Sequence, residues 1–324
     1  MYDVLIVGAG PIGIACAVEC RAKNMDYIVI EKGCLVNSIY NYPVNMTFFS
    51  TSERLEIGDV PFISHGIKPV RSEALEYYRR VKSTKKLNIN LYEKVLTIEG
   101  ESGNFTVTSE KNVYNAKVVI IATGFFDFPN LLNVPGENLP KVKHYFDDPH
   151  LYADTNVIVV GGGNSAVDAA LETFRKGANV TMVILKESID PNVKYWVKPD
   201  IENRINDGSI NALFKSKINK IGEDTVTIDT PNGEIVLKND FVLAMTGYHP
   251  DFEFLASCGI STQNDETNEP FYNSTSFETN VPGIFLAGVV CCGLETRKWF
   301  IENSRFHAVN IANQIKKMLK KGFN

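Results

Sequence analysis

The chain has 324 residues, of which 44% are hydrophobic and 22% are charged, an ordinary composition for a globular protein of two domains. Its net charge of −5 gives no support for nucleic-acid binding. No apolar run approaches the roughly 20 residues that a membrane-spanning helix needs, so we expect neither a nucleic-acid nor a membrane partner.

The first thirty residues predict one βαβ unit. A strand over residues 4–7 leads into a glycine turn, a helix over 12–23 and a second strand over 27–30, with the β-branched residues that a buried parallel sheet favours. The opening "MYDVLIVGAG" shows no charged-then-apolar leader, and the six cysteines follow no disulfide-scaffold spacing. We therefore expect a cytoplasmic protein with mostly free thiols.

The glycine turn of this unit follows the pattern G-x-G-x-x-G. Gly8 permits the tight turn, Gly10 lets a pyrophosphate approach the backbone, and Gly13 lets the helix pack closely on the strand. Glu31 follows 23 positions after Gly8, where a carboxylate can accept hydrogen bonds from a ribose diol. Strand, helix and acid in this order predict a dinucleotide site.

Two later segments mark connections between domains. "VVIIATGFFDFPN" (118–130) and "FVLAMTGYHPDFEF" (241–254) each end an apolar strand in Thr-Gly, followed by aromatic, Asp and Pro residues. They predict an inserted domain over residues 127–244. The first domain is then discontinuous and consists of residues 1–126 and 245–324.

A second βαβ unit starts at Asn156 with "NVIVVGGGNSAVDAALETFRKGANVTMVIL". Gly161, Gly163 and Ala166 follow the variant pattern G-x-G-x-x-A, which is common where the dinucleotide is a nicotinamide. The two units repeat one architecture, and an internal duplication of this kind implies two nucleotide-binding domains. The sequence therefore predicts an α/β protein with two Rossmann-like dinucleotide-binding domains, one inserted into the other.

The second unit lacks the expected ribose-binding acid. Its last strand runs into Lys186, 25 positions after Gly161, and a cation suits a 2′-phosphate. This favours NADPH over NADH. Two other interpretations stay open: Glu187 takes the position if the register slips by one residue, or Lys186 is an ordinary solvated lysine.

Two dinucleotide folds in one chain imply two nucleotides. The N-terminal site with Glu31 suits FAD, and the nested site suits NADPH. In such a pairing the nicotinamide delivers a hydride to the flavin, which passes electrons to a third molecule.

The whole chain resembles the low-molecular-weight thioredoxin reductase-like flavoproteins, through "GAGPIG", "ATG", "GGGNSAVD", "TGYHPD" and "GIFLAG". Longer segments resemble the bacillithiol disulfide reductase branch of this group: "SIYNYPVNMTFFSTSERLEIGDVPF", "KPVRSEALEYYRRV", "VKYWVKPDIENRINDGSI" and "FIENSRFHAVNIA". The resemblance implies an NADPH-dependent, FAD-containing reductase of a small thiol disulfide, acting as a homodimer.

Three departures from the family pattern concern the route of the electrons. The second glycine helix carries no Cys-x-x-Cys, and the closing motif reads Gly288-Val289 where Gly-Asp is usual. Ile12 stands where members of the branch often have a cysteine. Cys16 lies one helical turn further on. It is a candidate catalytic thiol, and a small buried helix residue is the alternative.

Further candidates complete the predicted cofactor contacts. Lys32, Ser38 and Asn45 are candidates for FAD contact, against the alternative of an ordinary polar loop. All the predicted cofactor-binding residues are Gly8, Gly10, Pro11, Ile12, Gly13, Glu31, Lys32, Ser38, Asn45, Thr123, Gly124, Gly161, Gly163, Asn164, Ser165, Ala166, Lys186, Gly288 and Val289. A disulfide between the adjacent Cys291 and Cys292 would close a strained ring, so we interpret them as small residues packed beside the flavin.

Other functions remain alternatives. A flavin monooxygenase, a ferredoxin-linked reductase without Cys-x-x-Cys and a non-enzymatic flavin redox sensor fit the same two glycine motifs. The five histidines show no metal-ligand spacing, so no metal site is predicted.

Overall fold

Apolar strands joined by glycine turns build the first sheet in the computed structural model, which describes residues 1–323. β1 (Tyr2–Val7), α1 (Pro11–Ala22) and β2 (Tyr27–Ile30) form the predicted βαβ unit. β1 and β2 are parallel, and Val7 pairs with Ile30. All four residues of β2 are buried, as a parallel sheet with covered faces requires.

The chain folds into two units. The first comprises Met1–Asn41, Met46–Phe128 and Tyr248–Asn324, and the second comprises Tyr42–Asn45 and Pro129–Gly247. β7 (Phe128–Pro129) and β16 (Tyr248–His249) pair with each other at the two points where the long inserted stretch begins and ends.

The sheet of the first unit has seven strands, in the order β3-β2-β1-β6-β5-β4, with β17 also paired to β6. One part of β6 therefore receives β17 from the end of the chain in parallel, while another part continues into the antiparallel β4–β5 hairpin. The further strands of this sheet are β3 (Ile89–Asn90), β4 (Val95–Glu101), β5 (Asn104–Ser109), β6 (Val113–Ile121) and β17 (Ile284–Leu286).

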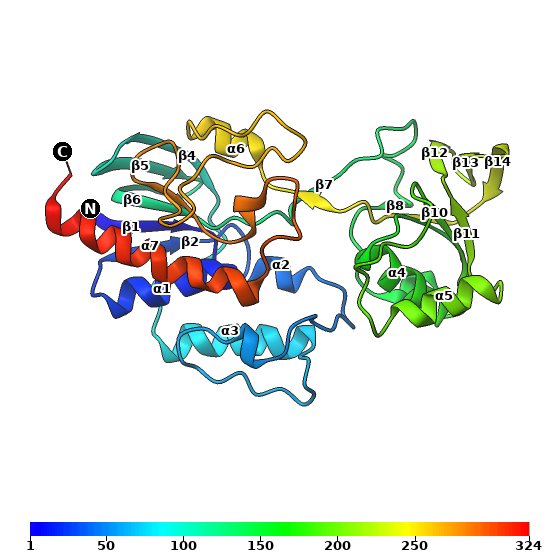
Figure 1. Cartoon of the computed structure of the whole chain (residues 1–324), viewed down its shortest axis with the longest axis horizontal. Helices are drawn as coiled ribbons and strands as arrows, with labels where there is room; N and C mark the ends of the chain where they lie inside the picture. Colours follow the sequence, from blue (N-terminus) through cyan, green and yellow to red (C-terminus); the bar gives the residue numbers. More distant parts are fainter. Residues whose placement is uncertain (324) are drawn as a thin grey trace. The chain divides into compact units, whose positions relative to one another are not determined.

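Helices cover this sheet, and the C-terminal helix α7 (Ile301–Lys321) lies beside α1 (Figure 1). Short segments before α7 and between the early strands carry the connections. They are α2 (Asn37–Tyr40), η1 (Glu53–Leu55), α3 (Arg71–Thr84), α6 (Phe252–Ser257) and η3 (Val289–Cys292). Among the described residues, no helix is both long enough and apolar enough to span a membrane.

The second unit has a parallel sheet in the order β11-β10-β9-β15-β8 and a separate antiparallel sheet, β12-β13-β14. Apolar clusters of buried side chains involve the strands of the parallel sheet. The elements are β8 (Val142–Lys143), η2 (Pro149–Tyr152), β9 (Asn156–Val160), α4 (Asn164–Phe174), β10 (Asn179–Ile184), α5 (Lys198–Asn206), β11 (Asn211–Phe214), β12 (Lys217–Ile221), β13 (Thr225–Thr230), β14 (Gly233–Lys238) and β15 (Phe241–Ala244).

Candidate functional site

The glycines of the first turn serve two different purposes. A Cβ on Gly8, whose φ is +102°, would lie 2.7 Å from the Ala122 carbonyl oxygen, and one on Gly13 would lie well inside 3.0 Å of the Gly8 oxygen. Gly10 differs: a Cβ there would meet no atom of the described residues within 4 Å. The fold itself requires Gly8 and Gly13, whereas Gly10 leaves open space at the start of α1.

The start of α1 is suited to an anion. Gly10 is the N-cap and makes no side-chain capping bond, Pro11 occupies the first turn, and no acidic residue follows in that turn. Unpaired N–H groups and the positive end of the helix dipole attract phosphate at such a terminus. Ile12 lies next to the closing motif, because a Cβ on Gly288 would be 3.2 Å from its side chain.

Glu31 is held at the end of β2 by the backbone. Its carboxylate accepts hydrogen bonds from the Ala9 N–H at 2.6 Å and the Gly33 N–H at 2.9 Å, and the residue is only 6% exposed. Burial raises the pKa of this carboxyl, and the two N–H bonds oppose the rise. Neighbouring Lys32 forms an ion pair with Asp127 at 2.8 Å.

The closing motif meets the same edge of the sheet. Gly124 and Gly288 both have positive φ, and a Cβ on Gly124 would be 3.9 Å from the Val289 side chain. The Gly288 N–H donates to Nδ1 of His307, on α7, at 3.2 Å. The structure thus brings together the first glycine turn, Thr123-Gly124 and Gly288-Val289.

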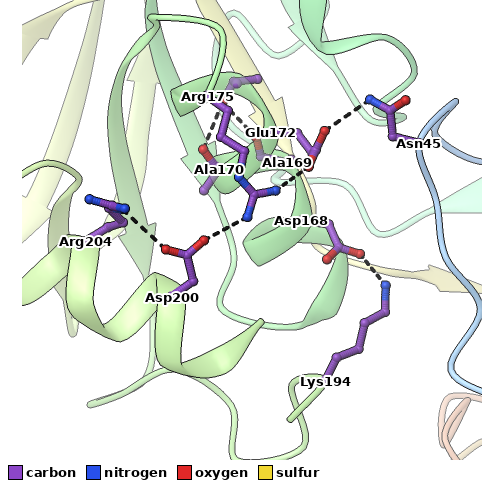
Figure 2. Close-up of polar contacts among 10 residues, drawn as sticks. Asn45, Asp168, Ala169, Ala170, Glu172, Arg175, Lys194, Asp200 and Arg204 are labelled. Carbon is purple, nitrogen blue, oxygen red and sulfur yellow. Dashed lines mark hydrogen bonds and ion pairs between the residues drawn. The ribbon is translucent and has the colours of Figure 1, made fainter. Parts of the chain in front are cut away.

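Ser38 and Asn45 are the remaining predicted contacts of the first site. Ser38 is part of the short helix α2. Asn45 belongs to the second unit, and its side-chain amide donates to the Glu172 carboxylate on α4 at 3.1 Å (Figure 2). Contact between Asn45 and FAD stays a prediction from the sequence.

The six cysteines are free, and all except Cys34 are buried. Cys16 is 1% exposed, and burial raises the pKa of its thiol well above its usual value, with neighbouring Cys20 adding to the rise. A buried thiol of high pKa is a poor nucleophile, so the structure gives Cys16 no support as a catalytic residue. Cys291 and Cys292 are fully buried in η3, directly after Gly288-Val289.

We expect Cys34 alone to react when the native protein is treated with a small alkylating reagent near pH 8, because its thiol is partly accessible and the other five are buried. Mass spectrometry of the labelled peptides measures this, with urea-unfolded protein as the fully labelled control. We also expect Cys16→Ala to keep its flavin and its turnover within about twofold of wild type. Native labelling at Cys16 would contradict the burial.

In the second glycine turn, as in the first, one glycine is required by close packing and another faces open space. A Cβ on Gly161, whose φ is +124°, would lie 2.5 Å from the Met245 carbonyl oxygen, whereas one on Gly163 would meet nothing within 4 Å. Gly163 is the N-cap of α4 and makes no side-chain capping bond. Asn164 and Ser165 open this helix, and Ala166 is buried against the turn. A second open helix start therefore exists.

Sheet register identifies the residue that corresponds to Glu31. Val7 pairs with Ile30 in the first unit and Val160 pairs with Val183 in the second, so the next residue is Glu31 in one and Ile184 in the other. Ile184 is 1% exposed and has no polar group for a ribose hydroxyl. The register places Ile184 in this position, two residues before Lys186.

The charged residues after β10 are paired with one another. The Lys186 side chain is 71% exposed, and its ammonium lies 3.5 Å from the Asp190 carboxylate. Glu187 pairs with Lys215 at 2.5 Å. Lys186 is therefore an accessible cation, and the carboxylate of Glu187 is turned toward another lysine.

Two polar features of the structure were absent from the sequence prediction. His307 is buried under the closing motif, and Lys194 pairs with Asp168 beside the start of α4 (Figure 2). Each contact joins residues far apart in the chain. No motif spacing points to either one.

Each of the two units contains parallel strands and a glycine turn that opens at the start of a helix, which is the arrangement of dinucleotide-binding folds. The chain belongs to the pyridine nucleotide-disulphide oxidoreductase family, whose model matches residues 5–288.

Individual relatives and solved structures show which members of this family the chain is similar to. It is 46% identical to bacilliredoxin reductase Bdr of Bacillus subtilis over 97% of each chain. The structure of bacillithiol disulfide reductase Bdr (YpdA) from Staphylococcus aureus matches with a TM-score of 0.95 at 43% identity, covering 99% of both chains. The structure of bacillithiol disulfide reductase Bdr (YpdA) from Bacillus cereus matches with a TM-score of 0.95 at 44% sequence identity, covering 98% of this chain and 99% of that chain. The predicted α/β fold with two Rossmann-like domains, the family and the enzyme class are confirmed.

Proposed function

We propose that the chain is an NADPH-dependent, FAD-containing reductase of a low-molecular-weight thiol disulfide, with bacillithiol disulfide as the first choice of substrate. The reaction converts NADPH, a proton and one disulfide into NADP⁺ and two thiols. The observation that carries the proposal is the pair of open glycines, Gly10 and Gly163, each at the start of a helix where the fold itself leaves room for a Cβ. The names of the two similar structures, bacillithiol disulfide reductases from Staphylococcus aureus and Bacillus cereus, support the choice of substrate.

The first unit would hold FAD, which accepts the hydride and passes on the electrons when bound. The start of α1 offers its N–H groups to the pyrophosphate, and Glu31, fixed by two backbone bonds, has acceptor capacity left for a ribose diol. The residues proposed to contact FAD are Gly8, Gly10, Pro11, Ile12, Gly13, Glu31, Lys32, Ser38, Thr123, Gly124, Gly288 and Val289.

The second unit would bind NADPH. Its open turn at Gly163 receives the pyrophosphate, and Ile184 cannot select for a free ribose hydroxyl. Lys186, exposed at the end of β10, then supplies the charge for a 2′-phosphate. The residues proposed to contact NADPH are Gly161, Gly163, Asn164, Ser165, Ala166 and Lys186. A homodimer stays a prediction from the resemblance, and a cytoplasmic location stays a prediction from the cysteine pattern and the opening residues.

Anaerobic stopped-flow absorbance of the purified protein tests this function. NADPH should bleach the flavin, and bacillithiol disulfide should restore its colour, while glutathione disulfide and thioredoxin should not. Reduced flavin that persists with every disulfide would refute the reductase. Reoxidation by ferredoxin, or oxygen incorporated into an organic substrate, would instead favour one of the alternative enzymes.

Lys186→Ala should raise the KM for NADPH by about tenfold and leave the KM for NADH unchanged, because it removes one exposed cation from the 2′-phosphate. Flavin reduction rates at varied coenzyme concentration measure the effect. Lys176→Ala, an exposed lysine of the same unit in the turn after α4, is the control. Equal loss with both coenzymes would contradict the assigned role.

A further inference from the structure

The segment between β10 and α5 is bound to the start of α4. The Asp190 N–H donates to the Gly162 carbonyl oxygen at 3.0 Å, and the Lys194 N–H donates to the side-chain oxygen of Asn164 at 2.8 Å. Gly162 lies in the second glycine turn, and Asn164 is the first residue of the helix. These bonds attach the segment to the residues that surround the open helix start.

Lys194, which is buried, also makes an ion pair with a partly exposed carboxylate beside this helix. The residue is 8% exposed, and its ammonium donates to the Asp168 carboxylate at 2.6 Å (Figure 2). The ring of Trp196 lies 6.0 Å from the same ammonium. Because a buried ammonium is costly without a partner, the pair is a matched unit, and removing one member leaves an uncompensated charge.

The position of Asp168 creates an electrostatic problem for an anionic ligand. It lies four residues after Asn164, one turn into α4, and no acidic residue precedes it in the helix. A pyrophosphate at the start of α4 would approach this carboxylate, whose side chain is 26% exposed, and like charges at such separations repel each other. The Lys194 ammonium neutralises that charge by pairing directly with the Asp168 carboxylate.

We propose that Lys194 is a positioning residue for the nicotinamide dinucleotide: its ammonium neutralises Asp168, and its backbone N–H fixes Asn164 at the helix start. The inference rests on the proposed function, because it takes the second glycine turn as the nicotinamide site. Lys194 acts on the pyrophosphate, which NADPH and NADH share. Lys186 acts on the 2′-phosphate, which only NADPH carries.

The test is calorimetric titration of the full-length, flavin-loaded protein with NADP⁺ and with NAD⁺ at low ionic strength. Lys194→Met, which keeps the length of the side chain, should weaken the binding of both nucleotides by about tenfold. The double variant Lys194→Met/Asp168→Asn should return both affinities to within about twofold of wild type. A merely structural lysine would change the free energy of unfolding in these variants and leave the nucleotide affinities of the folded protein unchanged.

Controls separate charge from folding. Lys198→Met alters a nearby lysine that is paired with Glu202 at 3.9 Å, and both affinities should stay within about twofold of wild type. Should Lys194→Met fail to fold, Asp168→Asn alone decides, because an ammonium freed from its carboxylate should tighten the binding of both nucleotides severalfold. Unchanged affinity in Asp168→Asn, or a loss in Lys194→Met that the double variant does not restore, overturns the inference. Wild-type protein that binds neither nucleotide would instead refute the proposed function.

Discussion

Gly10→Ser should yield a protein that folds slightly better and has lost most of its affinity for flavin. Gly10 is an N-cap with extended backbone (φ −67°, ψ 175°) and no capping side chain, and serine in place of glycine at an N-cap stabilises a helix by roughly a few tenths of a kcal/mol. The same side chain would fill the space into which no protein atom projects. We expect the flavin dissociation constant to rise about 100-fold, which corresponds to roughly 2.7 kcal/mol.

Two further serine variants make the comparison decisive. Gly13→Ser should fail to fold, since its Cβ would lie well inside 3.0 Å of the Gly8 oxygen and overlap of this kind costs more than about 4 kcal/mol. Gly163→Ser should keep its flavin and lose NADP⁺ affinity. Flavin absorbance per chain, urea unfolding of flavin-free protein and NADP⁺ titration measure the three outcomes. A Gly10→Ser protein with its full complement of flavin would show that no ligand occupies that space.

The free energy of unfolding should fall by up to about 3 kcal/mol as the pH drops from 6.5 to 4, because of His307. Burial lowers the pKa of this histidine to about 4. Its Nδ1 accepts the Gly288 N–H, so the proton of the neutral ring is on Nε2, which is buried without a hydrogen-bond partner among residues 1–323. Protonating Nδ1 would place its N–H against the Gly288 N–H, so that two donors would face each other without an acceptor.

The sign follows from the direction of the shift. The unfolded state takes up its proton near pH 6.5 and the folded state only near pH 4, so the contribution is fully present above pH 6.5 and is lost between these values. Urea unfolding from pH 4 to 8 measures the slope. His307→Gln should reduce the slope of the free energy of unfolding against pH by the equivalent of about one proton. His150→Gln, at an exposed position, should leave the slope unchanged. A slope unchanged in His307→Gln would contradict the assignment.

The same variant should also affect the flavin. Loss of the Nδ1 acceptor leaves the Gly288 N–H unpaired, and Gly288 begins the closing motif. Acid pH and His307→Gln should therefore both promote flavin release, which fluorescence of the free flavin reports.

Both βαβ units could be predicted because their signals are local. Runs of β-branched residues, a glycine turn and a helical period follow one another within thirty residues, and the predicted strand over 27–30 coincides with β2. The spacing also indicates that Ile184 corresponds to Glu31, since Ile184 lies 23 positions after Gly161 and Glu31 lies 23 positions after Gly8. The strand register of the two sheets shows the same correspondence.

The remaining features depend on contacts that no local pattern encodes. Lys194 meets Asp168 across 26 residues, and His307 meets Gly288 across 19. Asn45 stands in a polar loop whose sequence does not indicate which unit it joins. Cys16 shares a helix with the first glycine motif, and its complete burial comes from packing against other elements. Tertiary packing decides each of these cases.

The late position of β17 and α7 in the chain has a consequence for biosynthesis. β17 pairs with β6 and α7 packs on α1. The N-terminal sheet therefore cannot be completed until the ribosome has added the last residues of the chain. The inserted stretch Pro129–Gly247 emerges earlier and can fold while the N-terminal unit still lacks a strand and a helix. A translation product that stops shortly after Gly247 would therefore carry one finished unit and one open sheet edge, which makes it a substrate for chaperones and proteases.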